Sequence, residues 1–160
     1  ILNRTVAKAK ELAEKINQHL GRDISKFGGE ERIAEEVARA DVVINVSTKG
    51  AAGSLEAYSA LAPASLPPTP ENIKKNLEEA KRILDLIPKT IVMSDIVLTE
   101  KGTPFLNAAK AAGLATLDGV PTVINQGVEA FWILHREELE KKGVTKEEVK
   151  AVMAEAAYRP

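Results

Sequence analysis

The feature that most constrains the fold of this chain is an alternation of short apolar runs with capped helices. The apolar runs lie at residues 41–46, 90–94 and 115–117, and the first is a continuous β-branched stretch typical of a buried strand with both faces covered. Two intervening helices start at residues 69–70 and 103–104, where threonine caps precede prolines at the first helical position. This order, without a hairpin signal, predicts an α/β fold with a parallel sheet and helices on both faces.

The remaining segments predict further helices. A helix over residues 6–20 follows Thr5 as its cap and ends at Gly21. A short charged helix is expected over residues 30–40, with Ile33, Val37 and Ala38 facing inward. A mostly apolar stretch, 121–134, predicts a buried helix, and a capping box that opens at residue 145 starts a last helix to about residue 157. Residues 1–2 are expected to end a further strand, and 22–29 to form a loop with at most a short strand.

Composition narrows the class of protein. The 160 residues are expected to form one domain, 1–160, and the net charge of −1 gives no electrostatic reason to expect nucleic acid or a membrane as partner. The chain contains no cysteine, which excludes disulfides and thiol catalysis, and His19 and His135 lack metal-ligand spacing. No apolar run approaches the length of a membrane span and no signal peptide is visible, so a cytoplasmic protein is expected.

Polar residues follow the expected strands, at the edge where parallel sheets bind ligands. Arg4 follows the first strand end, and Lys8 lies one helical turn later. In dinucleotide-binding folds a basic residue at this point accepts the additional phosphate of NADP, whereas an acidic residue selects NAD. The alternative interpretation is an exposed arginine and lysine beside an ordinary threonine cap.

Four motifs, taken in order, resemble the shikimate dehydrogenase family. Residues 3–13, NRTVAKAKELA, resemble its NRTxx(K/R)AxxLA segment, and residues 45–50, NVSTKG, are similar to its NATxxG turn. Asp95 is followed at the family's spacing by TPFL at 103–106, and the stretch from Asp118 to Phe131 repeats its DG, QG and AF pairs. Each motif alone is weak, but together they cover most of the chain.

The resemblance implies a Rossmann-like, NADP-binding domain that is incomplete at its amino-terminal side. It implies an NADP-dependent oxidoreductase that transfers hydride between NADP(H) and 3-dehydroshikimate or shikimate, or a related polyol acid such as quinate. The pathway expected for this activity is the chorismate pathway of aromatic amino acid biosynthesis. The expected partners are a small-molecule substrate, the cofactor NADP and a second copy of the chain in a homodimer.

The resemblance also assigns site residues. The first group would hold the adenosine 2′-phosphate and adenine, the second would form a turn beneath the cofactor, and the third would lie near the nicotinamide. The last group would face the substrate. Gln126 would contact the substrate hydroxyls, and Leu98 stands where the family has a substrate-contacting tyrosine. These four groups are Asn3, Arg4, Thr5 and Lys8; Asn45, Val46, Ser47 and Thr48; Ile96 and Gly119; Gln126 and Leu98.

Structural alternatives remain open at three of these positions. In these alternatives, the Asn45 side chain only bonds neighbouring backbone, Gly119 only makes a turn, and Gln126 is a half-buried polar residue without a ligand. Leu98 cannot donate a hydrogen bond, so shikimate is the less fitting substrate. Tyr58 is a candidate to replace the lost tyrosine, with a half-buried anchor as the alternative.

The chain departs from the family in other ways. The family's glycine-rich phosphate loop and its catalytic lysine and aspartate precede the stretch matched here, so no catalytic residue is assigned and this stretch alone is expected to be inactive. An additional helix near residues 71–86 is interpreted as a packing or dimer helix in preference to a lid. Two alternatives remain: a non-catalytic nucleotide-binding or regulatory module, and a scaffold without nucleotide. The absence of an initiating methionine argues against a natural start at residue 1.

Overall fold

The computed structural model describes residues 1–158. The chain divides into two compact units, Ile1–Leu117 and Asp118–Pro160, which are described separately. None of the helices within the described residues is long and apolar enough to cross a membrane.

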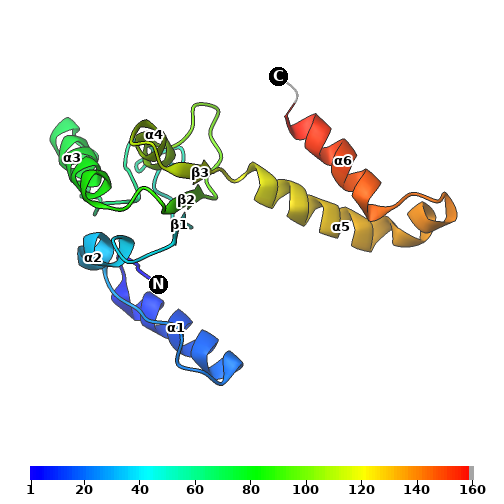
Figure 1. Ribbon diagram of the computed structural model, residues 1–160, viewed down its shortest axis with the longest axis horizontal. Helices are drawn as coiled ribbons and strands as arrows, with labels where there is room; N and C mark the ends of the chain where they lie inside the picture. The colour runs from blue at the N-terminus through cyan, green and yellow to red at the C-terminus, as the bar shows by residue number, and fades with distance from the viewer. Residues whose placement is uncertain (159–160) are drawn as a thin grey trace. The chain divides into compact units, whose positions relative to one another are not determined.

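The first unit contains a parallel sheet whose three strands lie in the order β1-β2-β3 (Figure 1). The strands are β1 (Val42–Asn45), β2 (Val92–Asp95) and β3 (Ala115–Leu117). The register pairs Asn45 with Asp95, so the carboxyl ends of β1 and β2 lie side by side. The predicted α/β class with a Rossmann-like parallel sheet is confirmed, and the sheet brings the polar residues after β1 and β2 to one edge.

The helices of this unit begin and end close to the predicted positions. Thr69 and Thr103 cap their helices through the side chain, which accepts from Asn72 N and Leu106 N. Gly21, at φ 62°, ends the first helix in the left-handed conformation that glycine adopts without strain. The helical elements are α1 (Val6–Leu20), the 3-10 turn η1 (Glu30–Arg32), α2 (Ile33–Val37), α3 (Pro70–Leu86) and α4 (Pro104–Ala111).

Two local predictions in the amino-terminal helices are wrong. The Thr5 side chain makes no capping hydrogen bond; instead the Thr5 N–H donates to Asn3 Oδ1 over 2.8 Å, in a turn that precedes α1. The charged helix ends at Val37, and Ala38 is exposed rather than inward-facing.

The core of the first unit lies against one face of the sheet. Met93 and Ile91 from the β2 region pack with Phe105 of α4, Leu84 of α3 and Val37 of α2. Together these elements bury a continuous apolar cluster, which holds the strand ends in fixed positions.

The opposite face of β1 corrects a prediction. The run at 41–46 was expected to be buried on both faces, yet Ile44 is 57% exposed and Val42 and Val46 are also exposed. Side chains alternate between the faces of a strand, and only the face that carries Val43 and Asn45 contacts the core of this unit.

Helix α3 matches the additional helix expected near 71–86. Its buried face differs from the predicted stripe, because Asn76 and Ile83 are buried whereas Leu77 is 39% exposed. The Asn76 side chain bonds the backbone of the preceding loop, accepting from Ser59 N over 2.7 Å and donating to Ala62 O over 2.9 Å. These contacts are those of a packing helix.

The second unit is a helical hairpin of α5 (Val120–Lys141) and α6 (Lys146–Ala157). The predicted capping box is confirmed: Thr145 N donates to Glu148 Oε2 over 2.8 Å, and Glu148 N donates to Thr145 Oγ1 over 3.2 Å. The Thr145 backbone N–H and, over 2.9 Å, the Thr145 hydroxyl both donate to the Glu148 carboxylate, and these two hydrogen bonds lower the pKa of that carboxyl.

The helix predicted over 121–134 is confirmed as part of the longer α5, but its predicted burial is wrong. Among the described residues of α5 only Ile124 and Val128 are buried, against Val149 of α6. Leu134 is 77% exposed, because a two-helix hairpin buries one stripe of each helix and leaves the remaining faces open.

Candidate functional site

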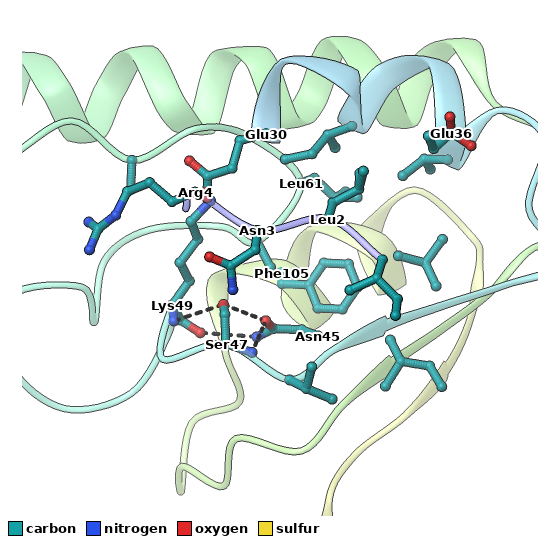
Figure 2. A pocket seen from close by; sticks show the side chains of 18 of the residues that line it. Leu2, Asn3, Arg4, Glu30, Glu36, Asn45, Ser47, Lys49, Leu61 and Phe105 are labelled. Carbon is teal, nitrogen blue, oxygen red and sulfur yellow. Dashed lines mark hydrogen bonds and ion pairs between the residues drawn. The ribbon is translucent and has the colours of Figure 1, made fainter. Parts of the chain in front are cut away.

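A groove of about 650 Å³ lies within the first unit (Figure 2). One side is formed by residues 1–5 and 8, the other by residues 42–49, and Leu61 and Phe105 also line it. Consecutive residues of β1 line the groove, as expected where a groove follows the edge of a strand. Two segments that are about forty residues apart in the sequence, 1–8 and 42–49, therefore line the same groove.

The amino-terminal side of the groove is held by a short parallel pairing. Leu2 forms an isolated bridge with Gly28, which is all that the structure shows of the strand expected at residues 1–2. Gly28 N donates to Ile1 O over 3.0 Å, and Asn3 N donates to Gly28 O over 3.2 Å. This pairing fixes the backbone that leads to Arg4.

Most of the predicted cofactor residues line this one groove. They come from the start of α1 and from the turn after β1, and the sheet and its core bring them together. The site predictions that meet here are Asn3, Arg4, Thr5, Lys8, Asn45, Val46, Ser47 and Thr48.

Arg4 and Lys8 are both exposed at the groove. Neither side chain has a hydrogen bond or ion pair with another of the described residues, and Figure 2 shows the Arg4 side chain at the groove. The first-turn amides of Val6 and Ala7 likewise have no acceptor among the described residues, because Thr5 does not cap α1. Free cations beside the positive end of a helix are suited to hold an anionic group.

Asn45 has a different role from the exposed cations, because its side chain is buried and fully used. Its Nδ2 donates to Lys49 O over 3.1 Å and to Asp95 Oδ1 over 3.0 Å, while its Oδ1 accepts from Ser47 N and Ser47 Oγ. The bonds to neighbouring backbone agree with the structural alternative, and the bond to Asp95 extends it. The Asn45 side chain shapes the turn, which leaves the exposed Val46 and Ser47 as its outer surface.

Asp95 is the centre of this polar network. The carboxylate is fully buried and accepts from Asn45 Nδ2, from Val97 N over 2.9 Å and from Thr103 Oγ1 over 2.7 Å. It thereby joins the turn after β1, the turn after β2 and the cap of α4. In the sequence, Asp95 is noted only for its spacing from residues 103–106, and its role in this network is not predicted. The feature that could have indicated the role is a carboxylate at a strand end, eight residues before a threonine cap.

Lys49 and Glu30 were also missed by the sequence analysis. They form a largely buried ion pair with an Nζ–Oε1 distance of 2.6 Å, and both line the groove. A lysine within a polar turn normally points to solvent, so nothing in the sequence indicated the pairing.

The predicted residues after β2 lie outside the groove. Ile96 N donates to Asn45 O over 3.2 Å, which places Ile96 beside the turn after β1, and both Ile96 and Leu98 are exposed. Tyr58 cannot replace the lost tyrosine, because its ring is fully buried and its hydroxyl donates to Ser65 O. It is a buried anchor of the loop before α3, more deeply placed than the half-buried alternative.

Gly119 and Gln126 belong to the second unit. Gly119 directly precedes α5 with φ −78°, a conformation open to any residue, so no turn there requires glycine. Gln126 is exposed on α5, which corrects the alternative of a half-buried side chain.

The comparisons with known proteins agree with this fold. The chain is 29% identical over 158 residues to the shikimate dehydrogenase (NADP(+)) of Brucella ovis, covering 98% of this chain and 45% of the relative. A crystal structure of a shikimate dehydrogenase in complex with NADP+ aligns with TM-score 0.65 and 22% identity, over 99% of this chain and 46% of that one. Quinate dehydrogenase from Corynebacterium glutamicum in complex with NAD aligns with TM-score 0.61 and 22% identity, over 96% and 45%. No protein-family model matches the chain.

The parallel sheet of the first unit, with its helices, has the Rossmann-like fold of these solved structures. The predicted resemblance to the carboxy-terminal part of shikimate dehydrogenases is confirmed, and the chain spans about half the length of the curated relatives it matches.

Proposed function

We propose that this chain is the cofactor-binding part of an NADP-dependent oxidoreductase of the shikimate or quinate dehydrogenase type. The observation that carries the proposal is the convergence of two distant segments, 3–8 and 45–48, on one groove with the free cations Arg4 and Lys8 beside it. Each segment also carries a motif that by itself predicts a cofactor-binding role.

The residues present fit an NADP molecule. Arg4 can form paired hydrogen bonds with the oxygens of the adenosine 2′-phosphate, and Lys8 adds a second positive charge. Asn3 and Thr5 complete this end of the groove, and the turn at 45–48 offers its backbone beneath the dinucleotide. NADP(H), when bound, supplies or accepts the hydride. The names of the relatives, which include NADP(+), and the structure crystallised with NADP+ support this cofactor.

The substrate side rests on fewer groups of this chain. Ile96 and Gly119 would lie near the nicotinamide, and Gln126 would contact substrate hydroxyls. Leu98 offers only an apolar contact, which weakens recognition of a substrate oxygen there. The proposed substrate is therefore shikimate or a related polyol acid such as quinate, which the Corynebacterium glutamicum relative is named for. A catalytic residue is expected only in the part of the relatives that this chain does not match.

A second candidate is a nucleotide-binding or regulatory module without catalysis. The observation that favours it is Leu98, an exposed aliphatic residue where the resemblance implies a hydrogen-bonding tyrosine. Three further properties stay predictions under either candidate function: a homodimeric assembly, a cytoplasmic location and a role in aromatic amino acid biosynthesis.

Steady-state kinetics of the complete protein tests the proposal. NADP+ is offered with shikimate and then with quinate, and NADPH formation is followed by absorbance. Turnover with either acid supports the enzyme, and the ratio of the two kcat/KM values identifies the preferred substrate. Binding of NADPH without turnover supports the regulatory module. If the protein shows no turnover and does not bind NADPH, the assignment of Arg4 and Lys8 to a phosphate is contradicted.

A further inference from the structure

Asp95 is a buried ionisable group to which the proposed function gives no part. Its side chain has no exposed surface, and the donors that the described residues offer it are neutral: Asn45 Nδ2, Val97 N and Thr103 Oγ1. Burying a carboxylate without a cation is costly, and hydrogen bonds to neutral donors offset only part of that cost. An apolar side chain would fill the end of β2 without this cost, so stability alone does not explain the residue.

The two oxygens of the carboxylate make different connections. Oδ1 accepts from Asn45 Nδ2 over 3.0 Å and from Val97 N over 2.9 Å, so one atom joins the turn after β1 to the turn after β2. Oδ2 accepts from Thr103 Oγ1 over 2.7 Å and connects the carboxylate to the cap of α4. The connection between the turns and the connection to the helix can therefore be removed separately.

The connection through Oδ1 continues into the backbone of both turns. Asn45 Oδ1 accepts from Ser47 N and Ser47 Oγ, and Asn45 Nδ2 also donates to Lys49 O (Figure 2). On the β2 side, Ile96 N donates to Asn45 O over 3.2 Å. Asp95 and Asn45 together thus fix the two turns against each other.

The side chains that these turns expose are ones that the resemblance assigns to the cofactor. Val46 is 71% exposed and Ile96 is 45% exposed, whereas the Asn45 and Asp95 side chains are buried. Val46 is assigned to the turn beneath the cofactor, and Ile96 to the nicotinamide. A change in the spacing of the two turns would therefore move the surface assigned to the reactive half of NADP(H).

These contacts do not depend on the amino-terminal segment that carries Arg4. They lie within the paired strands β1 and β2, the turns that follow them and the start of α4. The separation between Arg4 and the turn after β1 plays no part in them.

We propose that Asp95 is a positioning residue that fixes the turn after β1 against the turn after β2 and so aligns the nicotinamide for hydride transfer. The inference rests on the proposed function, in which the substrate acid loses a hydride from its carbinol carbon to NADP+ and a proton from its hydroxyl, giving the keto acid and NADPH. Hydride transfer needs close alignment of the two carbons, so a small shift of either turn slows this step. The phosphate contacts proposed for Arg4 and Lys8 are made by another segment, so affinity for NADP+ changes little.

Steady-state kinetics of the complete protein tests the shared acceptor with Asp95→Thr. The threonine hydroxyl lies one bond nearer the backbone and cannot accept from both turns, while the side chain keeps nearly the volume of aspartate and suits a strand. We expect kcat with the preferred acid, shikimate or quinate, to fall about tenfold, and KM for NADP+ to change less than about twofold. The isotope effect on kcat should rise when the carbinol carbon of the acid carries deuterium, because hydride transfer becomes more rate-limiting.

Two matched variants keep the shared acceptor. Thr103→Val removes the bond to Oδ2 and the side-chain cap of α4, so it should lower the Tm and leave kcat and the isotope effect unchanged. Asp95→Asn keeps an oxygen for Asn45 and Val97 and turns its amide towards Thr103, so kcat should stay within about twofold of the wild type. All variants are assayed well below their unfolding midpoints.

The kinetic outcomes separate positioning from the other roles of a buried carboxylate. If Asp95→Thr lowers the Tm as Thr103→Val does but leaves kcat unchanged, Asp95 only stabilises the fold and the inference is overturned. If Asp95→Asn lowers kcat as much as Asp95→Thr, the reaction needs the negative charge rather than the shared acceptor, and the inference is again overturned.

Hydrogen exchange without nucleotide gives a measurement that needs neither activity nor a folded Asp95→Thr variant. In the wild type, Asp95→Asn and Thr103→Val, we expect the Val97 amide to be protected together with the amides of residues 46–50. Unprotected exchange at Val97 in the wild type would show that Asp95 does not join the turns, and would overturn the inference. A wild type without turnover of either acid would instead contradict the proposed function.

Discussion

The two sides of the groove are built on opposite principles. On the β1 side, Asn45 and Asp95 are buried. The polar atoms of both side chains have hydrogen-bond partners within the protein. On the α1 side, Arg4 and Lys8 are exposed and have no partner among the described residues. Both sides resemble family motifs in the sequence.

The difference separates residues that shape a site from residues that can bind within it. A buried polar group that is satisfied internally fixes backbone geometry, and its loss leaves its partners unpaired. An exposed unpartnered cation contributes little to the fold but can approach a ligand. We therefore expect substitutions on the β1 side to change stability, and substitutions on the α1 side to change affinity.

The largest effect is expected for Asp95→Ala. This change leaves Asn45 Nδ2, Val97 N and Thr103 Oγ1 without their acceptor, and we expect the free energy of unfolding to fall by about 3 kcal/mol. Urea denaturation measures it, with the exposed Asp85→Ala on α3 as control. A loss as small as that of the control would break the comparison, because Asp95 would then not organise the strand ends.

Gly50→Ala should destabilise the same side somewhat less. Gly50 has φ +88°, and an added Cβ would lie 2.9 Å from the Thr103 side chain, so we expect a loss of about 2 kcal/mol. Gly53→Ala is the matched control, since Gly53 has φ +113° but open space around its Cα. Thermal unfolding of both variants separates backbone strain from the close contact; equal losses would show that the contact is unimportant.

Arg4→Glu tests the α1 side. We expect the affinity for NADP+ to fall about tenfold, or ~1.4 kcal/mol, because a charge-assisted bond to the 2′-phosphate becomes a repulsion. Affinity for NAD+ and the unfolding midpoint should stay unchanged. Titration calorimetry with both nucleotides provides the measurement, and Arg22→Glu, exposed beyond the end of α1, provides the control. Equal losses for NADP+ and NAD+ would contradict a role in phosphate recognition.

Lys8→Ala should have the smallest effect. A single exposed charge near the phosphate is expected to change NADP+ affinity about threefold at low ionic strength and less at physiological ionic strength, because salt screens it. Lys10→Ala is the control, since Lys10 is paired with Glu14 and lies outside the groove lining. An effect that does not diminish with salt would indicate a direct bond rather than a screened charge.

Local sequence signals determined much of this protein. The helix starts at Thr69, Thr103 and Thr145 followed from side-chain caps that need only neighbouring residues, and the parallel strands followed from apolar runs between helices. The candidate site residues on both sides of the groove were also selected from motifs in the sequence. These features depend on residues a few positions apart, which is why the sequence was sufficient.

Tertiary structure decided what each side chain does. The exposed face of β1 and the open faces of α5 depend on which elements cover them, and apolar content alone predicted burial for both. The pairing of Lys49 with Glu30 and the contacts of Asp95 join residues that are distant or separated by turns, so no local pattern encodes them. Whether a polar residue is satisfied by the protein or left for a ligand is fixed only when the chain has folded, because its partners come from other elements.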